Sequence, residues 1–216
     1  MKSILIIGMG RFGRSLAKNF TELGQEVMAV DTNESHINDV LPYVTSALIG
    51  DAEKESFLNT IGVRDYDLCI VAIGDNFQSS LEVTYLLKQH GAKYVVSRAS
   101  RDIQEKFLLN NGADEVVYPE RQLAEQTAIR LSNDSIFDYF ELDKNCVIYD
   151  VVIPKKWVGH TISELEIRKN YALNIIGARV NGKVVTDIDP YEKLQEGRRL
   201  LVAGTVKNIN KCFDIR

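Results

Sequence analysis

Short apolar runs alternate with amphipathic stretches through the first half of the chain. The predicted strands cover residues 3–7, 26–30, 46–49, 67–73, 93–97 and 115–118. Between them, apolar residues recur with helical spacing over residues 11–23, 34–41, 54–60, 77–89 and 102–110. Strands that are apolar on both faces and alternate with helices indicate a parallel sheet covered by helices on both sides. We therefore predict an α/β domain with a Rossmann-like, doubly wound sheet.

The pattern changes after Pro119. One amphipathic helix is predicted over residues 120–132, and a polar stretch follows it at 132–135. Beyond this stretch the apolar runs are short and rich in β-formers, at residues 146–153, 175–180, 183–185 and 199–203. We predict two domains, residues 1–134 with the crossover helix and residues 135–216 as a small α+β domain.

Two local signals support structure in the second domain. Thr161 with Glu164 three residues later forms a capping-box pattern, which predicts a small helix over residues 161–167. Asn181-Gly182 separates two β-type runs and predicts a tight hairpin turn.

A glycine motif lies between the first strand and the first helix. Gly8, Gly10 and Gly13 follow the GxGxxG spacing. In this context the first glycine allows a tight turn, the second lets the backbone approach a pyrophosphate, and the third allows close helix–strand packing. The helix N-terminus offers unpaired N–H groups to phosphate. The motif therefore predicts a nucleotide-binding site.

Two acidic positions follow neighbouring strands. Asp31 ends the second strand, 18 residues after Gly13. A carboxylate there can accept hydrogen bonds from both ribose hydroxyls and would repel a 2′-phosphate, which disfavours NADP. The alternative is that Asp31 only caps the next helix. Asp51-Ala52, after the third strand, either lines an adenine pocket or caps the following helix.

Arg11 and Phe12 lie inside the glycine turn itself. Arg11 is therefore placed to supply positive charge to a terminal phosphate, in its own subunit or in a neighbour. The alternative is a solvated arginine near a helix start.

Composition narrows the functional classes. The formal net charge of −4 and the pI of about 5.5 disfavour binding to nucleic acid, which needs a basic excess. We interpret the basic pairs Lys155-Lys156 and Arg198-Arg199 as solvated surface. The apolar runs are far shorter than the ~20 residues that span a bilayer. The start of the chain lacks a signal-peptide pattern, so we expect a cytoplasmic protein.

Cysteine and histidine positions argue against a metal centre and against catalysis. The chain has three of each: Cys69, Cys146, Cys212, His36, His90 and His160. No CxxC and no zinc spacing is present, and Cys69 lies in an apolar strand, so we expect reduced, structural thiols. No Ser/His/Asp or Cys/His arrangement is apparent. We expect no enzymatic activity, with an NAD-dependent oxidoreductase as the alternative.

The order of segments along nearly the whole chain resembles the RCK (regulator of K⁺ conductance) family. In the first half the resemblance rests on the glycine turn, Asp31, Gly50-Asp51-Ala52, Gly74-Asp75-Asn76 and Gly112-Ala113-Asp114-Glu115-Val116. In the second half it rests on Gly159-His160-Thr161-Ile162-Ser163-Glu164-Leu165, Leu194-Gln195-Glu196-Gly197 and Leu200-Leu201-Val202-Ala203-Gly204. The chain is most similar to KtrA-type subunits. This resemblance implies a regulatory subunit of potassium uptake that gates a KtrB-type membrane channel subunit. It also implies homodimers that assemble into a ring, an octamer, at the inner face of the plasma membrane.

The resemblance assigns roles to residues of the first domain. The implied ATP/ADP-binding residues are Gly8, Gly10, Arg11, Phe12, Gly13, Asp31, Asp51, Ala52, Arg98 and Glu120. Arg11 matches an arginine that reaches the terminal phosphate of ATP in the partner subunit, and Arg98 matches a basic residue that faces phosphate. Glu120 matches a carboxylate that holds Mg²⁺, Ca²⁺ or Na⁺ near the phosphates. Without the resemblance, Glu120 is an ordinary residue of the first turn of a helix.

The resemblance also implies a cyclic di-AMP site at a dimer interface of the second domain. The matching residues are Ile162, Ile167, Arg168, Asn174, Ile175 and Pro190. Apolar side chains would sandwich adenine, Arg168 would contact phosphate, and Asn174 would contact a base edge or phosphate. The alternative is a plain dimer core of isoleucines with an arginine at its rim.

Two other regulatory classes compete with this interpretation. One is an NAD(H)-responsive potassium subunit of the TrkA type, because Asp31 can bind the ribose of NAD or NADH as well as that of ATP. Arg11 in the glycine turn favours ATP/ADP. The other is a redox-responsive DNA-binding repressor, which the acidic pI and the lack of an N-terminal helical DNA-binding domain disfavour.

Overall fold

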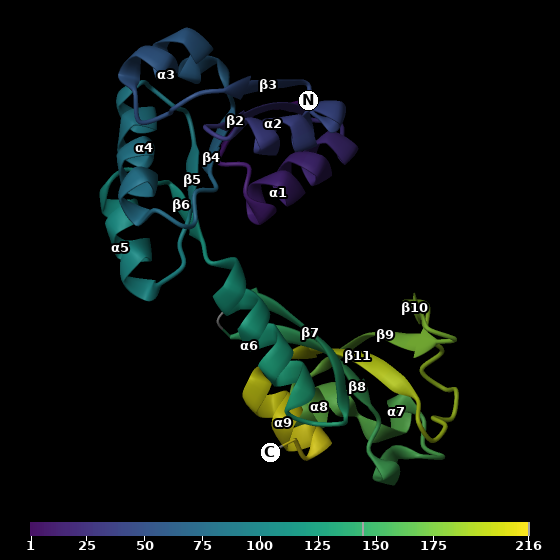
Figure 1. Cartoon of the computed structure of the whole chain (residues 1–216). Coiled ribbons are helices and arrows are strands. Elements are labelled where there is room, and N and C mark those ends of the chain that lie inside the picture. Colours follow the sequence, from purple (N-terminus) through teal and green to yellow (C-terminus); the bar gives the residue numbers. More distant parts are fainter. Residues whose placement is uncertain (144, 216) are drawn as a thin grey trace. The chain divides into compact units, whose positions relative to one another are not determined.

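The computed structural model describes residues 1–143 and 145–215 (Figure 1). The chain forms two compact units, and the division lies between Glu120 and Arg121. The sequence pattern placed the domain boundary at 134 instead. The two positions differ by most of one helix, α6 (Pro119–Leu131). Ile129 of α6 packs against the core of the second unit, which explains why the compact division precedes this helix.

The first unit contains a six-stranded parallel sheet in the order β3-β2-β1-β4-β5-β6. The strands are β1 (Ser3–Ile7), β2 (Glu26–Asp31), β3 (Ser46–Ile49), β4 (Leu68–Val71), β5 (Val95–Arg98) and β6 (Glu115–Val117). The direction of the strand order reverses between β1 and β4. The Rossmann-like, doubly wound fold predicted from the sequence is confirmed, and its switch point lies beside the glycine turn.

Helices cover both faces of this sheet (Figure 1). They are α1 (Arg11–Glu22), α2 (Glu34–Val40), α3 (Glu55–Ile61), α4 (Phe77–Gln89) and α5 (Asp102–Asn110), with short 3₁₀ turns η1 (Leu41–Tyr43) and η2 (Val63–Asp65). Alternate residues of β1 enter different cores. Ile4 and Ile6 pack with α1 and α2, while Leu5 and Ile7 pack with α3 and α4. Because β1 is buried on both faces, its sequence is a continuous apolar run.

Strand β4 is shorter than predicted at its carboxyl end. The sequence suggested residues 67–73, but β4 ends at Val71. Ala72 still donates to the Ile7 carbonyl at 2.8 Å, and the chain then leaves the sheet at the switch point. Residues 72–76 therefore line a pocket instead of extending the strand.

The second unit contains a five-stranded antiparallel sheet in the order β10-β9-β11-β8-β7. The strands are β7 (Ile136–Asp143), β8 (Cys146–Val152), β9 (Asn174–Val180), β10 (Lys183–Val185) and β11 (Arg199–Gly204). The helices are η3 (Lys155–Trp157), α7 (Ile162–Leu165), α8 (Ile167–Tyr171) and α9 (Val206–Phe213). The core lies between the sheet and α8 and α9, where the rings of Trp157 and Phe213 meet at 5.1 Å. The predicted α+β class is confirmed.

Local signals in this unit have mixed outcomes. The Thr161–Glu164 capping box is present, with reciprocal hydrogen bonds of 3.1 and 2.9 Å. The predicted helix over 161–167 is broken at Glu166, which takes a left-handed φ of 43° and separates α7 from α8. Asn181 and Gly182 both have positive φ, 49° and 79°, so the predicted hairpin turn is confirmed.

The interpretation of Arg198-Arg199 as solvated surface is wrong. Arg199 donates to Asp150 through Nε at 2.9 Å and also through Nη2, and its guanidinium lies 3.8 Å from the centroid of the Phe137 ring. Arg179 donates to the same carboxylate at 2.6 Å. The side chain of Asp150 is 0% exposed, and a buried carboxylate without such partners would be strongly destabilising. Lys155 and Lys156 are exposed, as predicted.

Two of the three predicted structural thiols are buried. Cys69 lies in the core of the first unit and Cys212 in that of the second. Burial raises the pKa of Cys69 to about 12 and that of Cys212 to about 11. Cys146 is half-buried, and all three are free thiols. Within residues 1–143 and 145–215, no helix combines the length and apolar character needed to cross a membrane.

Candidate nucleotide-binding site

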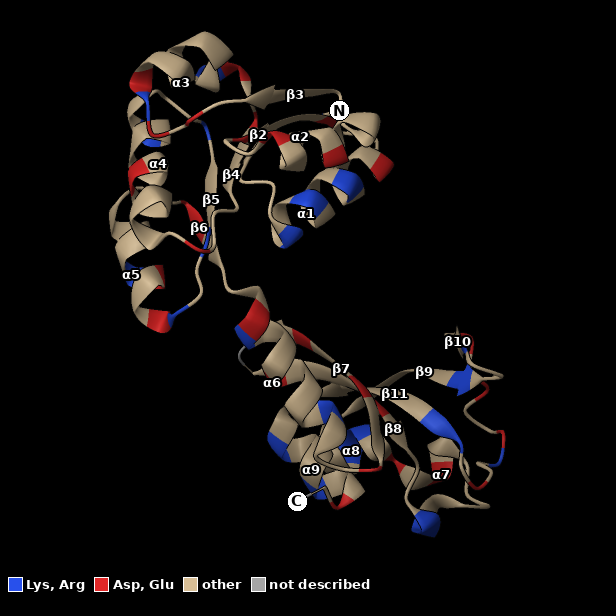
Figure 2. Ribbon diagram, in the orientation of Figure 1, with Lys and Arg blue, Asp and Glu red and all other residues tan. Residues whose placement is uncertain are grey.

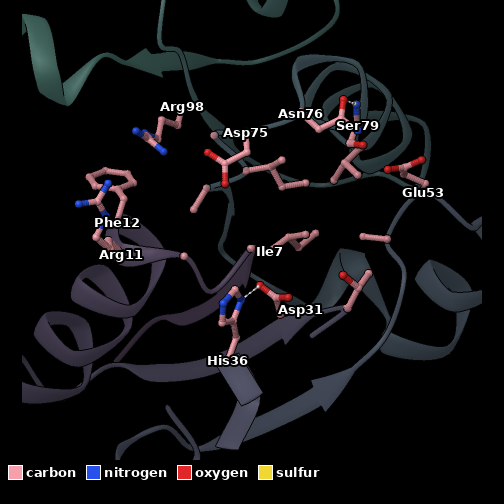
Figure 3. A pocket seen from close by; sticks show the side chains of 18 of the residues that line it. Ile7, Arg11, Phe12, Asp31, His36, Glu53, Asp75, Asn76, Ser79 and Arg98 are labelled. Atoms are coloured by element: carbon pink, nitrogen blue, oxygen red, sulfur yellow. Dashed lines mark hydrogen bonds and ion pairs between the residues drawn. The ribbon is translucent and has the colours of Figure 1, made fainter. Parts of the chain in front are cut away.

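A pocket of about 830 Å³ opens at the carboxyl ends of the parallel strands (Figure 3). Its walls come from the loops after β1, β2, β3, β4 and β5. This edge at the switch point is where open α/β sheets bind ligands, because the loops diverge there. The volume lies within the range of small-molecule sites, roughly 300–1,000 Å³.

The glycine turn needs two of its three glycines for steric reasons. Gly8 has a φ of 96°, and a side chain there would meet the backbone of Ile73 at 3.0 Å. A Cβ on Gly13 would lie 1.9 Å from the Gly8 carbonyl oxygen. Gly10 has no neighbour within 4 Å of an added Cβ and lines the pocket, so its role is to leave open space. Gly13 packs behind the turn, which suits its predicted role in helix–strand contact.

Asp31 is fixed at the floor of the pocket by the turn. Its side chain is 11% exposed. Oδ2 accepts the Met9 N–H at 2.5 Å, and Oδ1 accepts the Asn33 N–H at 2.8 Å. The N-cap of α2 is Asn33, whose side chain accepts the Ser35 N–H. The alternative that Asp31 itself caps this helix is therefore wrong.

Asp51 and Ala52 line the pocket on the side of β3. Asp51 Oδ1 accepts the Glu53 N–H at 3.0 Å, and its carboxylate lies 3.4 Å from the Lys54 ammonium. Lys54 is the N-cap residue of α3, so Asp51 closes the turn before the helix and does not cap it. Ala52 is almost fully buried and leaves room beside the turn.

A charged cluster occupies the opposite side of the pocket. The Arg98 guanidinium lies 5.7 Å from the centroid of the Phe12 ring and donates to the Glu120 carboxylate. Its Nε is buried and has no hydrogen-bond partner within the described residues. Gly74 makes room for it, because a Cβ at that position would lie 2.0 Å from Nη1. Arg11 lines the same pocket and is exposed, so both predicted arginines can reach an anionic ligand.

Opposing effects act on the pKa of the exposed Glu120 side chain. Desolvation raises its pKa, but a backbone hydrogen bond and the charges of Arg98 and Arg11 together hold the pKa of Glu120 below its usual range. Among the described residues, no cluster of three or more His, Cys, Asp or Glu side chains has the arrangement of a metal site. Glu120 would thus supply one ligand, and a cation such as Mg²⁺ would take its other oxygens from phosphate and water.

Several residues of the pocket were not assigned as ligands from the sequence. They are Ser15, Thr32, His36, Glu53, Asp75, Asn76 and Ser79. Thr32, Glu53, Asp75 and Asn76 lie in the loops that follow strands at the same sheet edge, and that position was the signal available for them. Asn76 also caps α4 through the Ser79 N–H at 3.3 Å, which holds the loop after β4 against the pocket.

The predicted cyclic di-AMP residues are only partly accessible in this chain. Ile167 is 4% exposed and belongs to the core of the second unit, and Ile162 and Ile175 pack against that core. Arg168 and Asn174 are exposed on α8 and β9. The remaining residue, Pro190, is tied to the start of α7, because its carbonyl accepts the Ser163 N–H at 3.0 Å. The burial of Ile167 leaves little of its side chain for a base.

Comparison with known proteins gives matches along both units. Residues 4–119 match the TrkA-N domain model, and residues 146–215 match the TrkA-C domain model. The Ktr system potassium uptake protein C of Bacillus subtilis (strain 168) is 35% identical over 210 residues, which cover 97% of this chain and 95% of that protein. The Ktr system potassium uptake protein A of the same organism is 31% identical over the same shares.

Solved structures share the fold across both units. The GsuK channel superposes with a TM-score of 0.72 at 19% identity, covering 98% of this chain and 39% of the channel chain. A GsuK channel bound to NAD gives a TM-score of 0.70 at 18% identity with the same shares. The chain thus spans about two fifths of the length of these channel proteins.

Proposed function

The chain belongs to the family built from TrkA-N and TrkA-C domains, the RCK-type regulatory subunits of Ktr and Trk potassium uptake systems, and on that premise we propose that it gates a KtrB-type channel subunit in response to ATP and ADP. One observation carries the proposal. The pocket places a fixed carboxylate, Asp31, and two arginines, Arg11 and Arg98, on its walls. A ribose needs the carboxylate, and phosphates need the arginines and the glycine turn.

Arg98 is prepared for an anion. Its Nε is buried without a partner, and such a group costs free energy until a ligand or water satisfies it. Glu120 beside it can hold a cation against the phosphates, with Mg²⁺, Ca²⁺ or Na⁺ as candidates. Arg11 is exposed and free to reach a phosphate in its own subunit or in a neighbouring one.

The gating mechanism is a population shift in a ring of homodimers, an octamer by family resemblance, on the cytoplasmic side of the membrane. ATP and ADP favour different dimer arrangements because only ATP offers a γ-phosphate to Arg11 and Glu120. A ligand shifts such an equilibrium only by its difference in affinity for the two states. This mechanism needs no chemical turnover, and we expect no enzymatic activity. We retain residues 1–134 and 135–216 as its functional domains.

Cyclic di-AMP is the proposed second ligand, bound where two copies of the second domain meet. The exposed Arg168 and Asn174 supply polar contacts, while Ile162, Ile175 and Pro190 supply apolar ones, with Ile167 behind them. Binding at this site is coupled reciprocally to nucleotide binding in the first domain.

An NAD(H)-responsive subunit of the TrkA type is the second candidate. The loop after β4, with Gly74, Asp75 and Asn76, also lines the pocket. In a doubly wound sheet this side of the switch point receives the second half of a dinucleotide. Asp31 serves the adenosine ribose of either ligand.

Calorimetric titration of the full chain with ATP, ADP, NADH and cyclic di-AMP tests the proposal. We expect weaker ATP binding in Arg11→Ala and weaker cyclic di-AMP binding in Arg168→Ala. Matched controls are Arg14→Ala, on the same helix but paired with Asp39, and Lys169→Ala, which pairs with Glu166. NADH binding far tighter than ATP would favour the TrkA-type candidate. No binding of any ligand would contradict both.

A further inference from the structure

In the pocket, His36 lies next to the carboxylate of Asp31, the proposed ribose ligand. It is the third residue of α2, and its Nδ1 is 3.2 Å from Asp31 Oδ2 (Figure 3). Its side chain is 36% exposed, while that of Asp31 is 11% exposed. Among the described residues that line the pocket, His36 is the only histidine and there is no cysteine. It is therefore the one side chain of this lining whose type usually titrates between pH 5 and 8.

The hydrogen bonds of Asp31 leave little room for a ribose. An ionised carboxylate offers about four acceptor positions. Oδ2 already accepts from the Met9 N–H and contacts His36, and Oδ1 accepts from the Asn33 N–H. One acceptor position, on Oδ1, remains. A ribose with both hydroxyls needs two, so His36 must leave Asp31 before both can bind.

We propose that His36 is a positioning residue that competes with a ribose hydroxyl for Asp31 and makes ribose recognition depend on its own protonation. The inference rests on the proposed binding of a ribonucleotide in this pocket. A protonated imidazole donates from both nitrogens and adds an ion pair with the carboxylate. A neutral imidazole donates from only one nitrogen and carries no charge. Low pH therefore holds His36 on Asp31, and high pH releases the carboxylate to the ribose.

Other charged groups near α2 do not remove this dependence. On α1, Arg11 lines the pocket, and Arg14 is paired with Asp39 of α2. The remaining titratable groups on α2 and on the elements that contact it are Glu34 of α2 itself, Lys18 and Glu22 of α1, Glu26 of β2 and Tyr43 of η1, and the loop after β3 adds Asp51, Glu53 and Lys54. Apart from His36, all of these are carboxylates, arginines, lysines or a tyrosine, whose ordinary pKa values lie outside pH 6–8.

The test compares ADP with 2′-deoxy-ADP at pH 6 and pH 8 by calorimetry. The two ligands carry the same phosphates, so the ratio of their Kd values cancels phosphate ionisation. The deoxy ligand offers one ribose hydroxyl, which the free position on Oδ1 can accept while His36 stays. We expect the preference of the wild-type chain for ADP to rise by about three- to tenfold from pH 6 to pH 8, the effect of one hydrogen bond.

Variants separate this role from a merely structural one. His36→Ala and His36→Gln carry no charge at either pH, so both should show one preference for ADP at pH 6 and pH 8, close to the high-pH value of the wild type. His160→Ala is the matched control, because His160 is 57% exposed in the second unit and should leave the pH profile unchanged.

The outcomes are distinguishable. A wild-type preference that is equal at both pH values, or a pH dependence that survives in both His36 variants, overturns the inference while the ribonucleotide site stands. Failure of both ligands to bind at either pH contradicts the proposed function, and the inference falls with it.

Discussion

The two units of the chain use their side chains in different ways. In the first unit the central strands are buried on both faces, and the candidate ligand residues lie at or just beyond the strand ends, around one pocket. In the second unit three of the candidate ligand residues, Ile162, Ile167 and Ile175, belong to the core or pack against it. Binding can therefore be separated from folding by mutation in the first unit more cleanly than in the second.

The arginines of the two units also have different surroundings. Figure 2 shows basic residues on α1 in the first unit and on β9 and β11 in the second. On α1, Arg11 is exposed at the pocket and available to a ligand. On β9 and β11, Arg179 and Arg199 are committed to the buried Asp150. These arginines therefore differ: Arg11 is accessible to a ligand, whereas Arg179 and Arg199 stabilise a buried carboxylate.

The largest effect is expected at Asp150. Asp150→Ala removes the carboxylate that compensates the charges of Arg179 and Arg199. We expect it to lower the free energy of unfolding of the second unit by about 3–5 kcal/mol. Urea unfolding followed by Cys212 labelling measures this, with Asp187→Ala, an exposed position, as control. ATP binding to the first unit should persist. A loss below about 1 kcal/mol would put Asp150 in the class of weak surface pairs.

A smaller effect is expected in the glycine turn. Gly13→Ala forces a Cβ to within 1.9 Å of the Gly8 carbonyl oxygen, so the turn must shift. We expect a loss of about 1–3 kcal/mol in the stability of the first unit, typical of overpacking. Gly10→Ala is the matched control, since nothing lies within 4 Å of its added Cβ. Equal thermal stability of the two variants would contradict the steric role of Gly13.

The buried thiols allow the unfolding of each unit to be followed separately, without a further substitution in either core. Cys69 reports on the first unit and Cys212 on the second, and burial raises both pKa values far above neutral. In the Cys146→Ser background, Gly13→Ala should speed labelling of Cys69 alone, and Asp150→Ala that of Cys212 alone. Parallel acceleration of both thiols by either variant would mean that the units unfold together.

The smallest effect concerns Glu120. The pKa of Glu120 in the folded chain lies below its ordinary value. Its contribution to stability is therefore fully present when the pH is above the ordinary pKa, and it is lost as the pH falls through the lowered pKa. NMR titration should show the pKa of Glu120 rising in Arg98→Ala. Because Glu120 is 59% exposed, the change in stability should stay within the range of surface pairs. An unchanged pKa would remove Arg98 as its main partner.

Local sequence patterns predicted the parts of the molecule that depend on neighbours in the chain. The glycine turn, the Thr161 capping box and the Asn181-Gly182 hairpin are all specified within a few residues. Strand β7 was missed, because it is an edge strand with irregular pairing to β8 and mostly exposed side chains. Helix α9 was also missed; it has only eight residues and takes its stability from burial against the sheet.

Contacts between distant residues could not be predicted. Asp150 meets Arg179 and Arg199 from 29 and 49 positions away, and no local pattern encodes that pairing. His36 was assigned to a helix correctly, but its turn towards Asp31 depends on how α2 packs beside β2. In the same way, the partner of Arg98 became visible only when the end of β5 met the start of α6.

Binding of ATP to the wild-type chain and to Asp31→Ala, measured by calorimetry, tests most directly whether the first unit is a ribonucleotide site. We predict one ATP per chain for the wild type and a Kd about ten- to a hundredfold higher for the variant, the loss of hydrogen bonds to a charged group. Asp51→Ala should change the Kd less, because the Asp51 side chain is 36% exposed and lies 3.4 Å from the Lys54 ammonium. An unchanged Kd in Asp31→Ala would contradict the assignment of this pocket to the ribose.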